Sequence, residues 1–374
     1  MDFVSASPKG DMQMISFGMM SRSFNSERTY FTEIAKRANP DIFTCYRFAP
    51  AKIHPITEMV AGEKFDHEKE KWVKAEFLLP KVIYDRCFYA NDHESKQSMA
   101  IVKWLKNRED ITFLGNGLPN KWSIYEVLSR SALAPYIPET ILVPSGKAVI
   151  VQLKKWSTAI LKPVFGSGGA GIYKIKNSGR KFAILAEADG RLSEKVFLST
   201  SETEAWLDRL CSKNEYMMQP YLELSDSHNC PFDIRVLLQK DRGDKWIMRG
   251  KGIRRGHKDG ILSNLAAGGE IQAFEDYAGS LDFRTRKFLS LELEEILSML
   301  PGILEASFPR LFELGIDIGV SKDKALWVLD TNSKPGRKVI TSLNPDLKEI
   351  LYKAPLEYAM TLSEILPERE GQHL

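Results

Sequence analysis

A glycine-rich stretch between two apolar runs constrains this chain more than any other feature. Residues 158–176 read TAILKPVFGSGGAGIYKIK, in which runs typical of β-strands flank four glycines, at positions 166, 168, 169 and 171. Glycine can adopt positive φ angles and lets a backbone approach a ligand closely. Successive N–H groups in such a loop form a concavity that binds anions, and Lys162 at the end of the first run can reach the same anion. The stretch therefore predicts a phosphate-binding loop.

Three phosphate-binding interpretations of this stretch differ in what they require around the glycines. The glycines satisfy G-x-G-x-x-G, but the dinucleotide motif requires a helix to follow, whereas residues 172–175 predict a second strand. The Walker pattern lacks its closing Gly-Lys-Ser/Thr. The third interpretation is a glycine flap between two antiparallel strands, which covers the phosphates of ATP with Lys162 beneath. A flexible hairpin without a ligand is the alternative, so the rest of the chain must decide.

The composition is that of an ordinary soluble protein of two or three domains. The chain has 374 residues, of which 43% are hydrophobic and 27% charged. Because the net charge is only +3 and Lys and Arg are scattered, we expect no nucleic-acid partner. The four cysteines form no C-x-x-C pair, which favours reduced thiols over a disulfide or zinc framework. Signal-peptide and membrane-span patterns are absent from the sequence, so we expect a cytoplasmic protein with no membrane partner.

Residues 1–117 predict an N-terminal α/β domain. Strands and helices alternate in it, which indicates a small and mainly parallel sheet. Ser26 is expected to cap the first helix, and a Gly-Asn-Gly segment followed by proline marks the end of the domain. The expected strands are 12–20, 42–48, 81–88 and 111–114, and the expected helices are 26–37 and 94–106.

Residues 118–345 predict a second and larger domain, followed by a helical tail at 346–374. We expect a small lobe at 118–200, which carries the glycine flap, and a larger lobe at 201–345 with a metal site. The expected helices are 120–133, 149–156, 202–210, 285–300 and 303–314, and the expected strands besides those of the flap are 138–146, 216–222, 233–238, 246–255, 314–320 and 326–332.

Three oxygen-bearing side chains lie on the last two predicted strands. Asp330 and Asn332 are two residues apart and so share one face of a strand, and Asp317 can lie opposite them on the paired strand. Carboxylate and amide oxygens are hard ligands that suit Mg²⁺, which commonly bridges to substrate phosphates. Buried acids are costly without a cation or hydrogen-bond donors. The pattern predicts a magnesium site; a hairpin whose acids cap turns is the alternative.

Basic residues gather on two predicted strands of the larger lobe. Arg235 lies on the first, and Lys251, Arg254 and Arg255 lie on the second. The planar fork of arginine suits carboxylate and phosphate oxygens, so these residues are candidates for contacts to an anionic substrate. A solvated basic face is the alternative. The following SNLAAGGE loop places Asn264 and a Gly-Gly pair where a backbone passes close to another group.

The strand expected at 216–222 ends in a Gln-Pro-Tyr-Leu segment. Pro220 prevents regular strand pairing and leaves backbone groups free. An adenine ring can use such groups, so this segment is a candidate adenine site.

Taken in order, these motifs resemble the ATP-grasp superfamily over residues 118–345. NLAAGG and the glycine flap resemble prokaryotic glutathione synthetase, and FELGIDIGV with WVLDTNSKPGR is most similar to the YheC/YheD family of endospore-coat-associated ATP-grasp proteins. The resemblance implies an ATP-grasp fold, α/β overall and α+β in its catalytic part, with residues 1–117 as a Rossmann-like pre-ATP-grasp domain. The matching features are a helix-borne Lys121, the Leu-Lys-Pro strand end, the GSGGAG flap, the MQPYL segment, the Asp233/Arg235 strand, the SNLAAGGE loop and the D…D-x-N pair of strands.

The resemblance also implies a role for each matching residue. Those implied in ATP binding are Lys121 and Lys162 at the α- and β-phosphates, Gly166, Ser167, Gly168 and Gly169 over the phosphates, Gln219, Tyr221 and Leu222 at the adenine, and Asp233. Those implied in Mg²⁺ binding are Asp317, Asp330 and Asn332. Those implied at the substrate are Arg235 and Arg254 as catalytic residues, facing the γ-phosphate and the acylphosphate, and Lys251, Arg255 and Asn264 as binding residues.

The chemistry that the resemblance implies is ATP-dependent ligation of a carboxylate to an amine. The carboxylate attacks the γ-phosphate, an acylphosphate forms, and the amine displaces phosphate to give an amide. The implied cofactors are ATP and Mg²⁺, and the implied partners are a small-molecule or peptide carboxylate, an amine acceptor and endospore-coat proteins. A nucleotide-binding scaffold without catalysis and a kinase-like transfer are the alternatives.

Two positions depart from the family pattern. Asp330 stands where many members have glutamate, so we expect one metal ion to bind more readily than two. Leu262 stands where glutathione synthetase has an arginine, which argues against glutathione synthesis itself.

Overall fold

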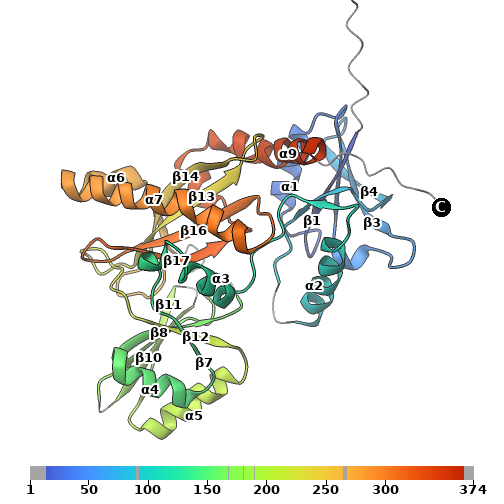
Figure 1. Cartoon of the computed structure of the whole chain (residues 1–374). Helices are drawn as coiled ribbons and strands as arrows, with labels where there is room; N and C mark the ends of the chain where they lie inside the picture. Colours follow the sequence, from blue (N-terminus) through green and yellow to red (C-terminus); the bar gives the residue numbers. More distant parts are fainter. Residues whose placement is uncertain are drawn as a thin grey trace, which may run out of the picture. The chain divides into compact units, whose positions relative to one another are not determined.

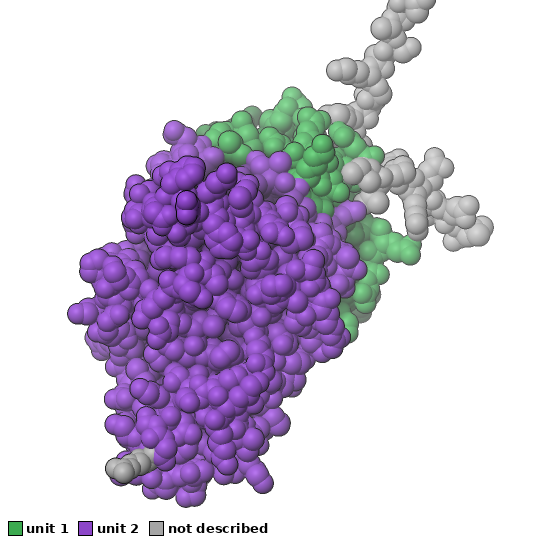
Figure 2. All heavy atoms as spheres, turned by 60° about the vertical axis from the view of Figure 1, so that its left-hand side comes forward, with its two compact units in different colours: residues 1–116, 240–245, 348–374 green, residues 117–239, 246–347 purple. Residues whose placement is uncertain are grey.

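The chain divides into two compact units (Figure 2). Unit 1 comprises residues 1–116, 240–245 and 348–374, and unit 2 comprises residues 117–239 and 246–347. The computed structural model describes residues 14–89, 92–166, 168–179, 181–188, 190–263 and 268–365. No helix within these ranges is long and apolar enough to cross a membrane.

A six-stranded sheet in the order β4-β3-β2-β1-β5-β6 forms the centre of unit 1 (Figure 1). Its strands are β1 Ile15–Met20, β2 Phe43–Phe48, β3 Met59–Asp66, β4 Lys71–Leu78, β5 Val82–Asp85 and β6 Thr112–Phe113. β1 pairs in parallel with β2 and β5, and β5 pairs in parallel with β6. The mainly parallel sheet expected from the sequence is therefore confirmed, with an antiparallel hairpin of β3 and β4 added at one edge.

The β3–β4 hairpin corresponds to no strand expected from the sequence. β4 is an edge strand, and its sequence KWVKAEFL is exposed or half-exposed at every position except Phe77. Edge strands of natural sheets commonly carry charges that discourage further pairing. Such charges weaken the apolar alternation by which a strand is predicted.

The helices of unit 1 are α1 Arg28–Arg37, α2 His93–Lys106 and α9 Leu347–Ile365. The expected cap at Ser26 is wrong, because Glu27 precedes α1 in a left-handed conformation with φ 58° and makes no side-chain cap hydrogen bond. α2 has a side-chain cap, since the Asp92 carboxylate accepts a hydrogen bond of 2.6 Å from the backbone N–H of Ser95. α9 accounts for the expected C-terminal helix as far as Ile365.

Unit 2 contains two sheets, the first of which carries the glycine loop and is called the flap sheet. Its strands are β7 Ile141–Val143, β8 Thr158–Pro163, β9 Tyr173–Asn177, β10 Phe182–Ala188, β11 Arg191–Phe197 and β12 Tyr216–Pro220. In the sheet they lie side by side in the order β11-β10-β9-β8-β12-β7. Helices α4 Gly146–Trp156 and α5 Thr200–Cys211 pack on it and share its core, which includes Leu153, Leu161, Ile175 and Leu207 (Figure 1). β10 and β11 correspond to no strand expected from the sequence.

The second sheet of unit 2 carries Asp233, Asp317 and Asp330 and is called the carboxylate sheet. Its strands are β13 Phe232–Lys240, β14 Trp246–Arg255, β15 Glu270–Gln272, β16 Glu313–Val320 and β17 Leu326–Asn332. In the sheet they lie side by side in the order β15-β14-β13-β16-β17. The helices around it are α3 Lys121–Leu128, α6 Phe274–Gly279, α7 Phe283–Ser307 and α8 Lys338–Leu343. Leu293, Leu300 and Ile316 belong to the buried core that α7 forms with this sheet.

α7 is one helix of 25 residues that ends at Ser307, so the expectation that the helix continues to 314 is wrong beyond this residue. Proline removes one backbone donor from a helix and usually breaks or kinks it, but Pro301 lies inside α7. Buried residues continue at helical spacing on both sides of the proline, at Leu293, Ile296, Leu300 and Leu304. Tertiary packing of this face therefore outweighs the local effect of the proline, and the chain turns into β16 at Glu313.

Candidate functional site

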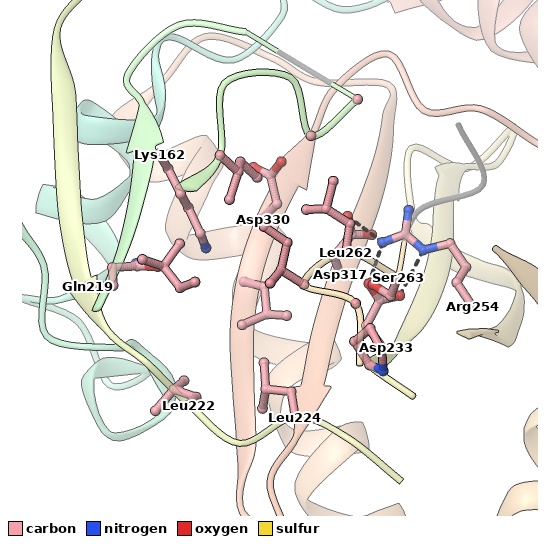
Figure 3. Close-up of a pocket in the computed structure, with 18 of the residues that line it drawn as sticks. Lys162, Gln219, Leu222, Leu224, Asp233, Arg254, Leu262, Ser263, Asp317 and Asp330 are labelled. Atoms are coloured by element: carbon pink, nitrogen blue, oxygen red, sulfur yellow. Dashed lines mark hydrogen bonds and ion pairs between the residues drawn. The ribbon is translucent and has the colours of Figure 1, made fainter. Parts of the chain in front are cut away.

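The flap sheet and the carboxylate sheet line one cleft, which has a volume of about 210 Å³ (Figure 3). Figure 3 shows Lys162 on one side of it and Asp233, Asp317 and Arg254 on the other. The structure brings most of the expected site residues together here: Lys121, Lys162, Gly166, Gly168, Gly169, Gln219, Tyr221, Leu222, Asp233, Arg235, Arg254, Asp317, Asp330 and Asn332.

The glycine loop joins two antiparallel strands, β8 and β9, whose pairing runs from Thr158 opposite Lys176 to Leu161 opposite Tyr173. A strand and not a helix follows the glycines, which excludes the dinucleotide interpretation and agrees with the strand order that the flap interpretation requires. All four glycines have positive φ, with values of 129°, 71°, 80° and 76° along the loop. Residues with a side chain rarely adopt these angles, which explains the glycine run.

Lys162 is half-buried at the end of β8, with its side chain among the residues that line the cleft. Burial is the larger cause that lowers its pKa, and the charge of Lys121 adds to it, so the pKa is about 8. Asp330 and Asp317 act in the opposite direction but do not restore the ordinary value. Lys162 is therefore a cation whose surroundings favour the approach of an anion.

Lys121 begins α3, which Asn120 caps by accepting a 2.9 Å hydrogen bond from the N–H of Ser123. Its backbone N–H donates to the carbonyl of Val164, which follows β8. Its ammonium group forms an ion pair and hydrogen bond with the Asp330 carboxylate on β17. Lys121 thus approaches the cleft already neutralised by an acid of the carboxylate sheet.

The Gln-Pro-Tyr-Leu segment lines the cleft where β12 ends. The Gln219 side-chain amide donates a hydrogen bond of 2.8 Å to the Thr140 hydroxyl. The Lys174 ammonium lies 3.6 Å from the centre of the Tyr221 ring. The backbone N–H of Tyr221 donates to the carbonyl of Thr158 at 3.1 Å. The expectation that Pro220 leaves the neighbouring backbone unpaired is therefore wrong for this N–H.

The acids of β16 and β17 occupy paired positions. Asp317 lies opposite Asp330, and Gly315 lies opposite Asn332, with a shift in register after Asp317. Asp317, Asp330 and Asn332 all line the cleft. The two-residue spacing and the strand pairing therefore place these oxygen-bearing side chains as the sequence indicated.

A buried ionic network joins three strands of the carboxylate sheet. Arg254 Nη2 lies 2.6 Å from Asp233 Oδ2 and 2.8 Å from Asp317 Oδ2, and these three residues are only 3–8% exposed. Arg235 Nε pairs with the other oxygen of Asp317 at 2.7 Å. The Ser263 hydroxyl donates to Asp233 Oδ2. The two aspartates and two arginines therefore compensate one another within the sheet.

Burial and charge shift the pKa values of this network in different directions. Burial raises the pKa of Asp233, even though the charge of Arg254 acts against it. Burial acts in the same sense on Asp317, but the charges of Arg254 and Arg235 outweigh it and hold the pKa of Asp317 below its usual range. For Arg254 burial favours the neutral form, yet the charges of Asp317 and Asp233 raise its pKa. Asp317 is therefore the acid that is most firmly held as a carboxylate.

Comparison with known proteins places the chain in a family. The family model described as YheC/D like ATP-grasp matches residues 110–362. Over 345 residues the chain is 36% identical to the endospore coat-associated protein YheC of Bacillus subtilis (strain 168). The matched region covers 92% of this chain and 95% of that protein. The chain belongs to the YheC/D-like ATP-grasp family. It is also 23% identical over 352 residues to the endospore coat-associated protein YheD of the same organism, with coverage of 92% and 76%.

Solved structures confirm the fold of this YheC/D-like ATP-grasp protein. D-alanyl-alanine synthetase A from Vibrio cholerae superimposes with a TM-score of 0.55 at 10% identity and covers 93% of this chain and 99% of its own. The VanG D-Ala:D-Ser ligase from Enterococcus faecalis superimposes with a TM-score of 0.54 at 10% identity, with coverage of 94% and 99%. The mixed α/β ATP-grasp fold expected from the sequence is therefore confirmed.

Some expected site residues of the YheC/D-like chain do not line the cleft as the structure describes it. The Lys251 ammonium lies 4.4 Å from the centre of the Phe274 ring, and Arg255 pairs with Asp226 at 2.6 Å. Alternation along β14 explains this, because Lys251 and Arg255 project on the face opposite to Arg254. Ser167 and Asn264 lie outside the described residues.

The resemblance implies Mg²⁺, and the donor set in the cleft fits this metal. Asp317, Asp330 and Asn332 present two carboxylates and an amide to one cleft, and Mg²⁺ takes such hard oxygens together with water and substrate phosphates. Among the described residues, no group of three or more His, Cys, Asp or Glu is placed to hold a metal ion. A metal bound here therefore needs further oxygens, which phosphates and water can supply.

Three residues at the cleft, Ser263, Lys174 and Ile160, were not predicted from the sequence motifs. Ser263 and Ile160 line the cleft, and Lys174 covers the Tyr221 ring. For Ser263 a signal exists, since it begins the SNLAAGGE loop. For Lys174 and Ile160 the only signal is alternation along the flap strands, which turns Ile160, Lys162 and Lys174 toward one face.

Proposed function

We propose that this chain is an ATP- and Mg²⁺-dependent ligase that joins a carboxylate to an amine through an acylphosphate. One observation carries the proposal: a single cleft combines a glycine flap and Lys162 from one sheet with paired acids and arginines from the other. Membership of an ATP-grasp family supports the assignment to ATP chemistry. The names of the fold relatives, a D-alanyl-alanine synthetase and a D-Ala:D-Ser ligase, support a ligase.

The flap side of the cleft would bind the phosphates of ATP. Glycines with positive φ present backbone N–H groups to a small anion, and Lys162 lies at the end of the strand that leads into them. Because its surroundings lower the pKa of Lys162, a phosphate beside it would stabilise the charged form. Gln219, Tyr221 and Leu222 would contact the adenine at the end of β12.

The carboxylate side would hold the metal and the reacting groups. Mg²⁺ bound by Asp317, Asp330 and Asn332 would supply neutralisation of the phosphate oxygens. Lys121, which pairs with Asp330 in this structure, would bind a phosphate from the same side of the cleft. Arg235 and Arg254, fixed by Asp317 and Asp233, would orient the acid and stabilise the acylphosphate.

The reaction needs no nucleophilic side chain from the protein. An oxygen of the substrate carboxylate attacks the γ-phosphorus, and the bond to ADP breaks. The amine nitrogen then attacks the carbonyl carbon, phosphate leaves, and the amine loses a proton to solvent. The contribution of the chain is orientation and charge stabilisation, as is general for phosphoryl transfer.

The names of the curated relatives favour a connection with the endospore coat. Both B. subtilis proteins are called endospore coat-associated, and we infer a cytoplasmic protein that acts on, or associates with, coat components. The same names favour a second candidate, a nucleotide-binding scaffold of the coat without catalysis. The ligase is preferred because compensated acids, arginines and two lysines converge on one cleft, a set that a scaffold does not require.

The test is acceptor-dependent release of ADP. The full-length protein is incubated with Mg²⁺, ATP and pools of amino acids or cell-wall peptides, and ADP and new amide products are measured. The ligase predicts ADP release that requires both an acid and an amine and is lost in Lys162→Ala. ATP binding without ADP release in any pool would favour the scaffold, and absence of ATP binding would refute both.

A further inference from the structure

Glu187 connects the two sheets of unit 2 by a contact that neither the motifs nor the proposed reaction use. It lies on β10 of the flap sheet and is 6% exposed. Its Oε2 accepts a 2.8 Å hydrogen bond from the backbone N–H of Ile261 and a 3.0 Å hydrogen bond from that of Leu262. Both donors belong to the segment that follows β14 of the carboxylate sheet. One buried carboxylate therefore links the flap sheet to the segment that follows β14.

The segment that Glu187 binds is folded so tightly that two of its positions accept only glycine. A Cβ on Gly256 would lie 2.0 Å from the carbonyl oxygen of Leu262. A Cβ on Gly260 would lie 2.9 Å from the carbonyl oxygen of His257 and 3.1 Å from the Glu187 carboxylate. The segment 256–262, called the anchored segment, is therefore shaped around the Glu187 carboxylate.

The anchored segment leads directly to the buried network of the cleft. Gly260, Ile261 and Leu262 line the cleft, whereas Glu187 is not among the described lining residues. The next residue, Ser263, donates its hydroxyl to Asp233, which pairs with Arg254. Arg254 in turn pairs with Asp317. Two sets of polar contacts, joined by the backbone between Leu262 and Ser263, thus connect the flap sheet to an acid of the expected metal site.

We propose that Glu187 is a positioning residue that holds the anchored segment closed against the cleft and, through Ser263, fixes the orientation of Asp233. The statement about the cleft rests on the proposed function, but the contact itself does not. A carboxylate is suited to this task because it accepts two charge-assisted hydrogen bonds from successive N–H groups. In its absence two buried or partly buried donors would lose their partner.

The first test is hydrogen exchange of the full-length protein without ligand. Glu187→Ala should speed exchange at the amides of Ile261 and Leu262 by about 10- to 100-fold, the range for losing a hydrogen bond to a charged group. Glu187→Gln, which keeps an oxygen acceptor, should restore most of the protection. Glu194→Ala is the matched control, because Glu194 is an exposed acid on the neighbouring strand β11. Unchanged exchange at Ile261 and Leu262 in Glu187→Ala would overturn the proposal.

A second variant, on the other side of the contact, tests the proposal even if Glu187→Ala does not fold. Gly260→Ala forces the backbone away from the carboxylate without altering Glu187. It should speed exchange at the same two amides while exchange in the core of α7 stays slow. Protection at these amides equal to that of the unmodified protein would refute the anchored segment as described.

The second test asks whether Glu187 acts on the cleft through Ser263. The dissociation constant of a non-hydrolysable ATP analogue with Mg²⁺ is measured for Glu187→Ala, Ser263→Ala and the double variant. The proposal predicts that each single variant weakens binding about 3- to 10-fold. The dissociation constant of the double variant should be no higher than that of the single variant with the lower affinity. Additive effects would overturn the route through Ser263. If the unmodified protein does not bind the analogue, the proposed function fails, while the exchange measurement still decides the contact.

Discussion

The two sheets that line the cleft place charge in opposite ways. Among the described residues that line the cleft, the flap sheet contributes Lys162 and no acid, whereas the carboxylate sheet contributes Asp233, Asp317 and Asp330 together with two arginines. Asp233 and Asp317 have oppositely charged partners within their own sheet, and Asp330 pairs with Lys121 of α3. The carboxylate sheet is therefore compensated before any ligand arrives, and the flap sheet is not.

The pKa values express the same difference. Burial, together with the charge of Lys121, lowers the pKa of Lys162 to about 8, and the charges of Asp330 and Asp317 do not offset this. Asp317 is also buried, yet the adjacent Arg254 and Arg235 hold its pKa below the usual range. Adjacent arginines thus keep Asp317 ionised, whereas Lys162 is a partly desolvated cation that an anionic ligand would stabilise. Each of the following predictions tests one side of this comparison.

The largest effect is expected at the proposed metal site of the carboxylate sheet. Asp330→Asn should abolish Mg²⁺-dependent ADP formation, because it removes a charged ligand from the cleft. Its stability should change by about 1 kcal/mol or less, since the pair of Asp330 with Lys121 is partly exposed. ADP release and thermal melting measure the two quantities, and Asn332→Ala should behave alike. Asp323→Asn, on the exposed turn between β16 and β17, is the control. Full activity in Asp330→Asn would refute the metal assignment.

A large loss of stability is expected when the compensation of the carboxylate sheet is broken. Arg254→Met leaves Asp233 and Asp317 buried with one cation fewer. Removing one partner of a buried ion pair typically lowers the free energy of unfolding by about 3–5 kcal/mol. Urea unfolding at pH 7 measures this change. A loss below about 1 kcal/mol would mean that the acids of this sheet do not depend on Arg254.

A medium effect is expected at the flap sheet. Lys162→Met should weaken binding of Mg²⁺ and ATP by about 1–3 kcal/mol, the range for losing a charge-assisted contact. Isothermal calorimetry measures it, with Lys176→Met on the adjacent strand β9 as the control. Equal ATP affinity in Lys162→Met and the unmodified protein would remove the flap lysine from the proposed site.

The same lysine predicts a pH dependence of stability. In the folded protein its pKa is about 8, below its ordinary value of 10.5, so the unfolded chain binds the extra proton between these values. Stability attributable to Lys162 therefore rises as pH increases from about 8 to 10.5, and its cost is fully present below pH 8. Lys162→Met should be more stable than the unmodified protein at pH 7, and the difference should narrow at pH 10. Unfolding in urea at both pH values checks this; a constant difference would contradict it.

The smallest effect is expected next to the buried network. Arg255→Met removes an ion pair with Asp226 that is partly exposed to water. Such pairs contribute about 0–1 kcal/mol, so its free energy of unfolding should differ little from that of the unmodified protein. The same urea titration used for Arg254→Met compares the two neighbouring arginines. Equal losses in both variants would show that burial of the network does not set the energetic difference.

Much of the cleft could be predicted because its motifs are local. Glycine at positions that need positive φ, and acids two residues apart on a strand, are properties of short segments. Elements with weak local patterns were missed, such as β4 and β11, whose residues are mostly exposed. The helix expected to continue to 314 ends at Ser307, because the chain turns there toward β16, a tertiary change of direction that no short segment reveals.

The sequence by itself determined the glycine flap, the order of the strands that carry the site, and the kinds of residue that reach the cleft. Only the tertiary structure decided which charges meet: Lys121 with Asp330, 209 residues later, Arg254 with two aspartates at once, and Glu187 with the backbone of the anchored segment. The physical reason is that turn geometry and strand alternation depend on neighbours in sequence. Compensation of a buried charge depends on which strands pair and on how helices and sheets pack, and no local pattern encodes these tertiary contacts.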